Sequence, residues 1–182
     1  IMVKKLFSSV EDETLENEEK INIESINTSV IKKILSDHPT YFQLETLRKM
    51  FNQIFKKNIK NYINNIPVLN SNITNILSNL KNASSKESAE GVALFSNFKD
   101  VNNMIVLKTS NEKNEDLLYE YFVGINGVNK LRKLIPNFMY TFSIFKCDNI
   151  IGTDYKNFCK SDGPVVNFTV FEKINGITWV EY

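Results

Sequence analysis

Histidine and cysteine are scarce in this chain, which contains one histidine and two cysteines among 182 residues. Cys147 and Cys159 do not form a CxxC pair, and His38 has no clustered partner. Protein zinc sites use closely spaced Cys and His ligands, so the sequence argues against a metal site or a disulfide framework. Cys147 and Cys159 flank a loop and can be bridged, but reduced thiols inside a cell are the simpler interpretation.

Long apolar runs are also missing. No stretch approaches the roughly 20 apolar residues that a membrane-spanning helix needs. The N-terminal residues lack the basic, apolar and small-residue order of a signal peptide. We therefore expect a soluble intracellular protein without a membrane span.

Glycine and proline are few, with 6 and 4 residues, whereas Asn, Lys and Ile are abundant. This bias is typical of AT-rich genomes, such as those of some large DNA viruses and certain protists, and says nothing about chemistry. The chain begins at Ile1 rather than Met and ends at Tyr182 inside what looks like a continuing element. We therefore expect it to be a piece of a longer polypeptide.

Neither sign of charge dominates, because 22 Lys and Arg stand against 21 Asp and Glu. The composition therefore does not indicate nucleic acid or an anionic membrane as a partner. The signs are separated along the chain, since 11–19 is acidic and 48–60 is basic. Such runs are usually solvated faces, and the alternative interpretation is a docking face for an acidic partner.

The first 82 residues predict an arm followed by helices. Residues 1–27 hold few large apolar side chains and are expected to form an acidic extended arm. Apolar residues at three- and four-residue steps predict helices over 30–35, 41–66 and 71–80. The segment 28–82 is therefore predicted to be a helical extension.

The composition becomes strand-like from residue 83 onward. Apolar runs predict strands over 92–95, 104–108, 137–146 and 165–171. Between the second and third of these strands, apolar positions at helical spacing predict one long helix over 117–135. We expect an α+β fold, in which a helical N-terminal region precedes an antiparallel sheet of about five strands packed with one long helix.

The stretch 104–136 is the centre of this prediction. Residues 104–107 form an apolar run with the length of a buried strand, yet the run ends in Lys108. An acidic turn with Glu115 and Asp116 follows, and then the amphipathic helix that Pro136 ends. The lysine requires an explanation, because a strand-end lysine otherwise simply extends to solvent.

This order of elements resembles the small lobe of eukaryotic-type serine/threonine protein kinases, over about residues 83–182. Val106-Leu107-Lys108 looks like the V-A-I-K strand of that family. The run 117–145, LLYEYFVGINGVNKLRKLIPNFMYTFSIF, is similar to the divergent kinases of large DNA viruses of the iridovirus and mimivirus type. The resemblance implies a location in the host cytoplasm or within a virion.

The resemblance implies roles for Lys108 and Glu120. In the family, this lysine holds the α- and β-phosphates of ATP and pairs with a glutamate of the following helix. Glu120 is the implied partner, because it lies 12 residues after Lys108 and just ahead of Tyr121. Glu115 and Asp116 are competing candidates.

Further residues are implied to hold the nucleotide. Gly91 is the single glycine of the loop SSKESAEG, where the family has G-x-G-x-x-G over the phosphates. Val92 is implied to form the roof over adenine, and Val106 to flank it. In the tail, Phe171 is implied to guard the adenine pocket, while the backbone of Glu172 and Ile174 hydrogen-bonds adenine.

Together these roles imply a protein kinase-like protein that binds MgATP. The catalytic base and the metal ligands belong to a large lobe expected after Tyr182, so this piece alone is not an enzyme. The alternative is an inactive kinase-like structural or interaction protein, for example a minor component of a viral particle. Protein substrates or assembly partners are expected to contact residues 28–80. A third interpretation is a helical adaptor whose β-rich half merely resembles a kinase.

Overall fold

The computed structural model describes residues 29, 31–33, 38–82, 92–98, 101–109, 114–148, 159 and 163–174. Its helices are α3 (Tyr41–Lys57), η2 (Ser71–Asn75, a 3-10 helix), α4 (Asn114–Val123), η3 (Gly124–Val128, a π-helix) and α5 (Asn129–Arg132). Its strands are β1 (Ile59–Ile63), β2 (Ile66–Leu69), β3 (Leu77–Asn82), β4 (Val92–Phe98), β5 (Val101–Thr109), β6 (Thr141–Asp148) and β7 (Val165–Glu172). None of the helices in these ranges is long and apolar enough to cross a membrane.

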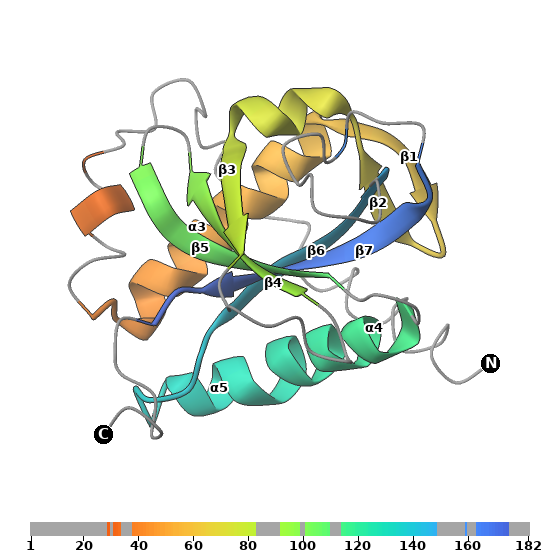
Figure 1. The fold of residues 1–182 in the computed structure, drawn as a ribbon. Coiled ribbons are helices and arrows are strands. Elements are labelled where there is room, and N and C mark those ends of the chain that lie inside the picture. Colours follow the sequence, from red (N-terminus) through yellow and green to blue (C-terminus); the bar gives the residue numbers. More distant parts are fainter. Residues whose placement is uncertain are drawn as a thin grey trace.

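The described strands form one mixed sheet in the order β1-β2-β6-β7-β5-β4-β3 (Figure 1). From β3 to β6 all neighbours pair antiparallel, whereas β2 lies parallel to β6. The α+β prediction is confirmed, and the four predicted strands are present as β4, β5, β6 and β7. The sheet is wider than predicted because the N-terminal region adds β1, β2 and β3.

The prediction of one helix over 41–66 is wrong beyond Lys57. Helix α3 ends there, and the chain continues into the hairpin of β1 and β2. The hairpin turns at Asn64 and Asn65, whose φ angles are 53° and 64°. Asparagine tolerates this left-handed conformation better than most residues, and two successive positive φ angles suit a tight two-residue hairpin.

The helix predicted over 71–80 is also wrong. Only η2 is helical, and β3 then pairs antiparallel with β4. Ile73 and Leu77 are buried as the apolar pattern predicted, but the pattern was too short to distinguish a helix from a turn followed by a strand. The segment 28–82 therefore does not form a separate helical extension, because it supplies strands to the common sheet. Its first predicted helix is described only at 31–33, which is helical, and the arm at 1–27 lies outside the described residues.

Helix α3 packs on one face of the sheet and closes the main hydrophobic core. Thr40 begins the helix with a capping box: its hydroxyl accepts from the Gln43 N–H, and its own N–H donates to the Gln43 side chain. Phe51 packs against Phe98 and Phe142, with ring centroids 5.0 and 5.2 Å apart. The other buried side chains of α3 are Leu44, Leu47, Met50, Ile54 and Phe55.

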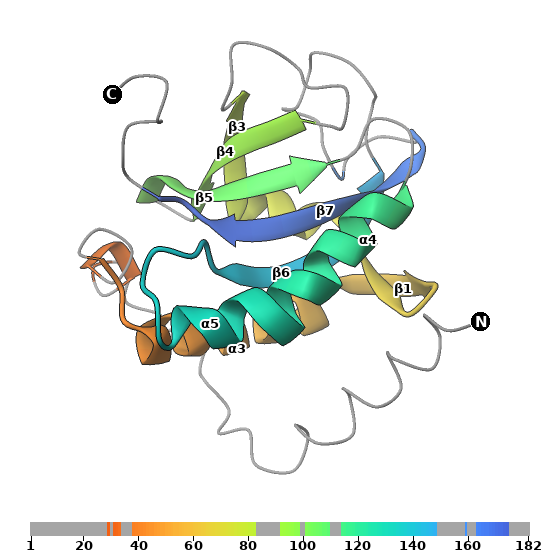
Figure 2. The ribbon, with the colours of Figure 1, turned by 90° about the horizontal axis from the view of Figure 1, so that it is seen from below.

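The layer of α4, η3 and α5 covers the opposite face. Figure 2, viewed from below, shows these helices in front of the sheet with α3 behind them. Successive side chains of a strand point to opposite faces, so each strand serves both layers. In β5, Leu107 belongs to the core beneath α3, whereas Lys108 contacts Glu120 of α4.

Two contacts fix this helical layer to the start of β6. The Asn129 side chain donates to the Thr141 carbonyl and accepts from the Thr141 N–H, both at 2.8 Å. Gly124 approaches the same threonine so closely that a Cβ at position 124 would lie 2.3 Å from Thr141 Oγ1. Only glycine fits this crossing without movement of its neighbour.

The C-terminal part of the predicted helix is less buried than its pattern indicated. The apolar stripe assigned Leu131, Leu134 and Ile135 to the core, but these side chains are 44%, 80% and 46% exposed. Phe138 and Met139, which the sequence placed in a strand, precede β6 and are also exposed. We call these five residues the apolar end of the helical layer.

The expectation of two reduced thiols is wrong for this structure, because Cys147 and Cys159 form a disulfide. The two Cα atoms lie 4.8 Å apart, within the range that a disulfide requires. The Cys159 N–H also donates to the Asp148 carbonyl at 2.7 Å, which places Cys159 beside the end of β6. The sequence spacing left this pairing open, and the fold brings the two residues together.

Gly124→Ala is expected to destabilise the protein, whereas Gly127→Ala is expected to stabilise it. Alanine favours a helix over glycine by about 1 kcal/mol, and nothing lies within 4 Å of a Cβ at position 127. At position 124 the added methyl group collides with Thr141, and such overpacking costs roughly 1–3 kcal/mol. Urea unfolding measures the free energy of unfolding of both variants. Changes of the same sign in the two variants would contradict the close approach of Gly124 to Thr141.

Candidate functional site

Lys108 and Glu120 form an ion pair that joins β5 to α4. Lys108 Nζ lies 2.5 Å from Glu120 Oε1, and the side chains are 26% and 39% exposed. Solvent screens a pair of this exposure, so it contributes little to stability, and its importance is geometric. Of the competing partners, Asp116 is exposed on the first turn of α4, and the Glu115 side chain lies outside the described residues.

The register of the sheet places several further residues on the face of Lys108. Opposite Lys108 lie Ala93 on β4 and Thr169 on β7. Two residues along, Val106 is opposite Phe95 and Phe171. The structure therefore brings the predicted Val106 and Phe171 onto the same sheet face as Lys108, although their roles stay predictions.

Val92 lies on the other face, which corrects its predicted role as the roof over adenine. It is opposite Thr109, one residue out of step with Lys108, and its side chain is 4% exposed in the core beneath α3. The register places Ala93 and Phe95 of β4, instead of Val92, on the face of Lys108. Gly91, the predicted phosphate-loop glycine, lies outside the described residues.

Phe95 is a residue that the sequence prediction missed. Its ring lies under the ammonium group of Lys173, which is 5.2 Å from the ring centroid. A contact of this kind is favourable because the face of an aromatic ring attracts a cation. Phe95 and Lys173 therefore connect β4 to the segment after β7, where the sequence predicted the adenine contacts.

Glu172 has a buried side chain, which the prediction for its backbone did not foresee. Its carboxylate accepts from Arg132 Nη2 at 2.9 Å and from the Tyr140 N–H at 3.0 Å. Its own N–H donates to the Tyr140 carbonyl, so this amide is not available to adenine and only the Glu172 carbonyl remains as a candidate. Ile174, the second predicted backbone contact, is 52% exposed.

Arg132 is the centre of a buried network at the end of the helical layer. The side chains of Arg132 and Glu172 are 7% and 5% exposed. Arg132 also donates to the carbonyls of Pro136 and Phe138, and at 3.5 Å to that of Pro39 just before α3. One guanidinium group therefore connects α5, the segment before α3 and the end of β7.

A second polar cluster connects α3 to the start of β6. The Tyr140 hydroxyl donates to Glu45, which also pairs with Arg48 at 3.0 Å. Burial, the hydrogen bond to Glu45 and the charge of Glu45 all raise the pKa of Tyr140 well above its usual range. Burial acts to raise the pKa of Glu45, but the hydrogen bonds from Tyr140 and Arg48 outweigh it and hold that pKa below its ordinary value.

Lys146 is a second amine on the face of Lys108. It is opposite Asn167, two residues before Thr169, and is 6% exposed. Burial disfavours the charged amine and lowers the pKa of Lys146. Thr169 Oγ1 has no hydrogen-bond partner among the described residues. The sheet face beneath α4 is thus partly polar, whereas the face beneath α3 is almost entirely apolar.

This site combines one ion pair with an apolar surface. Lys108 presents a positive charge fixed by a carboxylate, next to the apolar side chains of Phe95, Val106 and Phe171. Among the described residues, no group of three or more His, Cys, Asp or Glu side chains is arranged to hold a metal ion. Comparison of the chain with protein-family models, with curated proteins and with solved structures finds no match.

Arg132→Met is expected to destabilise the protein by about 3–5 kcal/mol, because it leaves the buried Glu172 carboxylate without its cation. Arg48→Met is the matched control, since Arg48 pairs with Glu45 in a more exposed position, with side chains 25% and 22% exposed. The control is expected to cost about 0–1 kcal/mol. Urea unfolding at neutral pH measures both, and equal losses would contradict the importance of the buried pair.

The loss of unfolding free energy in Arg132→Met, relative to the wild type, is also expected to depend on pH. Burial raises the pKa of Glu172 above its ordinary value of 4.5, and Arg132 opposes this shift. A raised folded-state pKa means that the folded protein binds the proton more tightly, so the contribution of Glu172 to stability falls as the pH rises above the unfolded pKa. Removal of Arg132 raises the pKa of Glu172 in the folded protein further, so the pH range over which Glu172 lowers stability extends upward. The loss of stability in Arg132→Met should therefore be smaller near about pH 5 than near about pH 8. Deficits that do not change with pH would contradict this assignment.

Proposed function

We propose that this chain is the nucleotide-binding small lobe, with its N-terminal extension, of a serine/threonine protein kinase-like protein. The observation that carries the proposal is the ion pair between Lys108 at the end of a central strand and Glu120 on the following helix. In protein kinases such a pair positions the lysine for the phosphates of ATP. The antiparallel strands β4, β5, β7 and β6 with α4 also agree with the lobe expected over 83–182, and β3, which precedes residue 83, adds a fifth antiparallel strand to them.

The residues on the face of Lys108 fit a nucleotide. Lys108 is suited to bind phosphate oxygens, and Glu120 holds its ammonium group in place. Phe95, Val106 and Phe171 offer apolar surface for a base, and the backbone after β7 offers hydrogen bonds at the Glu172 carbonyl and at Ile174. Bound Mg²⁺ neutralises charge on the phosphates during phosphoryl transfer. Its ligands and the catalytic base are expected in a large lobe after Tyr182.

The exposed apolar end of the helical layer is consistent with a second lobe that would cover it. Its five residues lie within 131–139, and Arg132 and Tyr140 connect this stretch to Glu172 at the start of the proposed hinge. Exposed apolar side chains gathered in this way usually mark a surface that another domain covers. Coverage by the large lobe would bury Leu134, which is 80% exposed here.

The second candidate is an inactive kinase-like protein that serves in an assembly, for example in a virion. The single glycine in the loop 84–91 favours it, because one glycine gives the backbone little freedom to approach phosphates. The two candidates differ in nucleotide binding. A ligand that binds the folded state raises stability by about 2.7 kcal/mol at a concentration 100 times its Kd.

Lys108→Met in the complete polypeptide that carries this chain is expected to abolish phosphoryl transfer without unfolding the protein. The variant removes the charge that binds phosphate, whereas the exposed pair itself contributes little to stability. Lys130→Met, on the exposed side of α5, is the matched control and should keep full activity. Transfer of labelled phosphate to a general protein substrate measures the activity.

The same variants separate the two candidates through a thermal shift at millimolar MgATP. A shift of several degrees in the wild type and in Lys130→Met, lost in Lys108→Met, supports nucleotide binding at this site. A shift without phosphoryl transfer indicates an inactive nucleotide-binding protein. No shift in the wild type would overturn nucleotide binding and favour the assembly component.

A further inference from the structure

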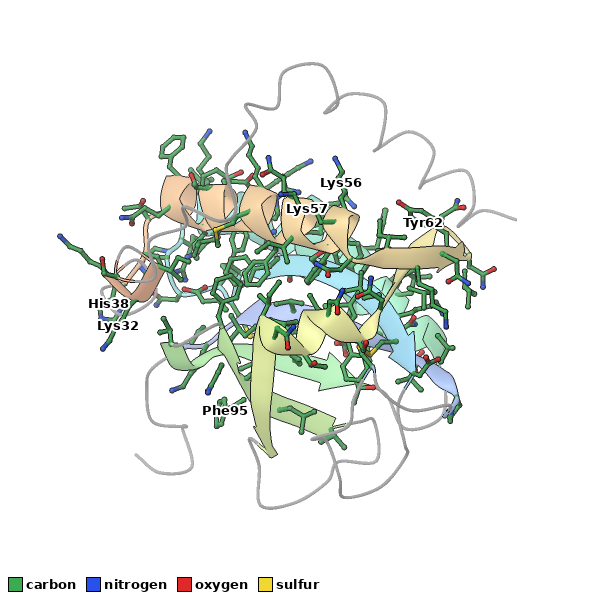
Figure 3. The ribbon with its side chains drawn as sticks, turned by 90° about the horizontal axis from the view of Figure 1, so that it is seen from above. Lys32, His38, Lys56, Lys57, Tyr62 and Phe95 are labelled. Atoms are coloured by element: carbon green, nitrogen blue, oxygen red, sulfur yellow. A yellow bond between two sulfur atoms is a disulfide. The ribbon has the colours of Figure 1, made fainter. Side chains whose placement is uncertain are left out.

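The segment 46–82 contributes only positive charges to the surface, because no acidic residue occurs between Glu45 and Glu87. Lys49 and Lys57 on α3 and Lys60 on β1 are exposed. Figure 3 shows Lys57 at the C-terminal end of α3, close to the hairpin that carries Tyr62. We call Lys49, Lys57 and Lys60 the basic face.

The basic face is not required for the packing of α3. The helix buries its apolar stripe against the sheet, and its arginine, Arg48, is paired with Glu45. Lys49, Lys57 and Lys60 form no ion pair with another described residue. Exposed like charges on α3 and the strand after it repel one another, so a negative partner would be attracted to them.

The sequence contains a segment of complementary charge. Six of the nine residues in 11–19 are acidic and none is basic. The segment ends 12 positions before Ile31, whose side chain is 3% exposed in the same core as the buried residues of α3. Twelve residues span at most about 40 Å when fully extended, and a helix of 17 residues is about 25 Å long. The acidic segment can therefore reach the whole basic face.

We propose that the acidic segment 11–19 binds the basic face of the same chain. A short tether holds the two at an effective concentration in the millimolar range, so weak ion pairs suffice without a tight interface. The interaction occupies a surface that would otherwise bind polyanions, and it is weakened by salt because the charges are exposed. It is independent of the proposed nucleotide site, which lies on the other side of the sheet.

Zero-length carbodiimide cross-linking of the full chain tests the proposal, because it joins a carboxylate to a lysine only where they touch. Cross-links from 11–19 to Lys49, Lys57 and Lys60 are expected at low salt, and about five- to tenfold fewer at about 0.5 M salt. Lys130 and Lys133, exposed on and just after α5, serve as control acceptors in the same sample. Size-exclusion chromatography selects monomers, so that only links within one chain are counted.

Reversing the charges on both segments tests whether the interaction is specific to this pair. The variant K49E/K57E/K60E should lose the compaction of the N-terminal segment, measured by energy transfer between dyes at positions 8 and 71. Adding E13K/E16K/E19K should restore it, whereas K130E/K133E should leave it unchanged. Cross-links spread equally to the control lysines, or exchange without restoration, would overturn the proposal.

An oligothymidylate probe tests the other occupant, a nucleic acid. If the acidic segment occupies the basic face, its neutralisation by E13Q/E16Q/E19Q should tighten binding of the probe about five- to tenfold. Equally tight binding to the wild type and to this variant would show that the acidic segment does not compete. The basic face would then be assigned to nucleic acid.

Discussion

The alternation of side chains along β5 determines what each side of the protein can do. Leu107 enters the core beneath α3, and the next residue, Lys108, meets Glu120 on the opposite side. Because β5 lies between β4 and β7, its register also sets which residues of those strands share a face. A shift of one residue would exchange the apolar and polar faces, so the packing of α3 and the position of Lys108 depend on the same register.

The two helical layers are held on the same sheet by different balances of interactions. Helix α3 binds through aromatic and aliphatic burial, with Phe51 and Phe55 among the strand phenylalanines. The α4 layer is held by directed contacts: the hydrogen bonds of Asn129, the close approach of Gly124 and the buried charge of Arg132. Directed contacts fix orientation more strictly than apolar burial does. Helix α3 adds directed contacts of its own to its apolar burial, because Glu45 accepts from the Tyr140 hydroxyl and Asn52 accepts from the Ser143 hydroxyl.

The apolar pattern of the sequence was enough to predict part of this structure. The strands around Lys108 and the helix after it follow from apolar runs and helical spacing. The pairing of Lys108 with Glu120 was implied by the resemblance to the kinase small lobe, which left Glu115 and Asp116 as competing partners. The pattern failed at β1 because Tyr62 and Ile63 continue a helical stripe in sequence, although they are exposed on an edge strand. A stripe alone does not show where the partner surface ends. For the same reason Leu134 was assigned to the core.

Other features depend on contacts that no local pattern contains. The disulfide of Cys147 and Cys159 requires the path of the chain between β6 and β7, and the Arg132–Glu172 pair joins positions 40 residues apart. The face of Val92 follows from counting residues across the antiparallel pair from Lys108 once the pairing is known. That pairing is the register of β4 on β5, which the sequence alone left undetermined.

The position of β3 at the sheet edge has a consequence for where the polypeptide can be divided. A boundary at residue 83, which the change in composition favours, would remove both β3 and α3. It would leave the backbone of β4 as an unpaired edge and expose the apolar core beneath α3. Open edges of this kind recruit other chains and promote aggregation. The folding unit therefore includes α3 and β3, and an expression boundary has to lie before Thr40, where the cap of α3 begins.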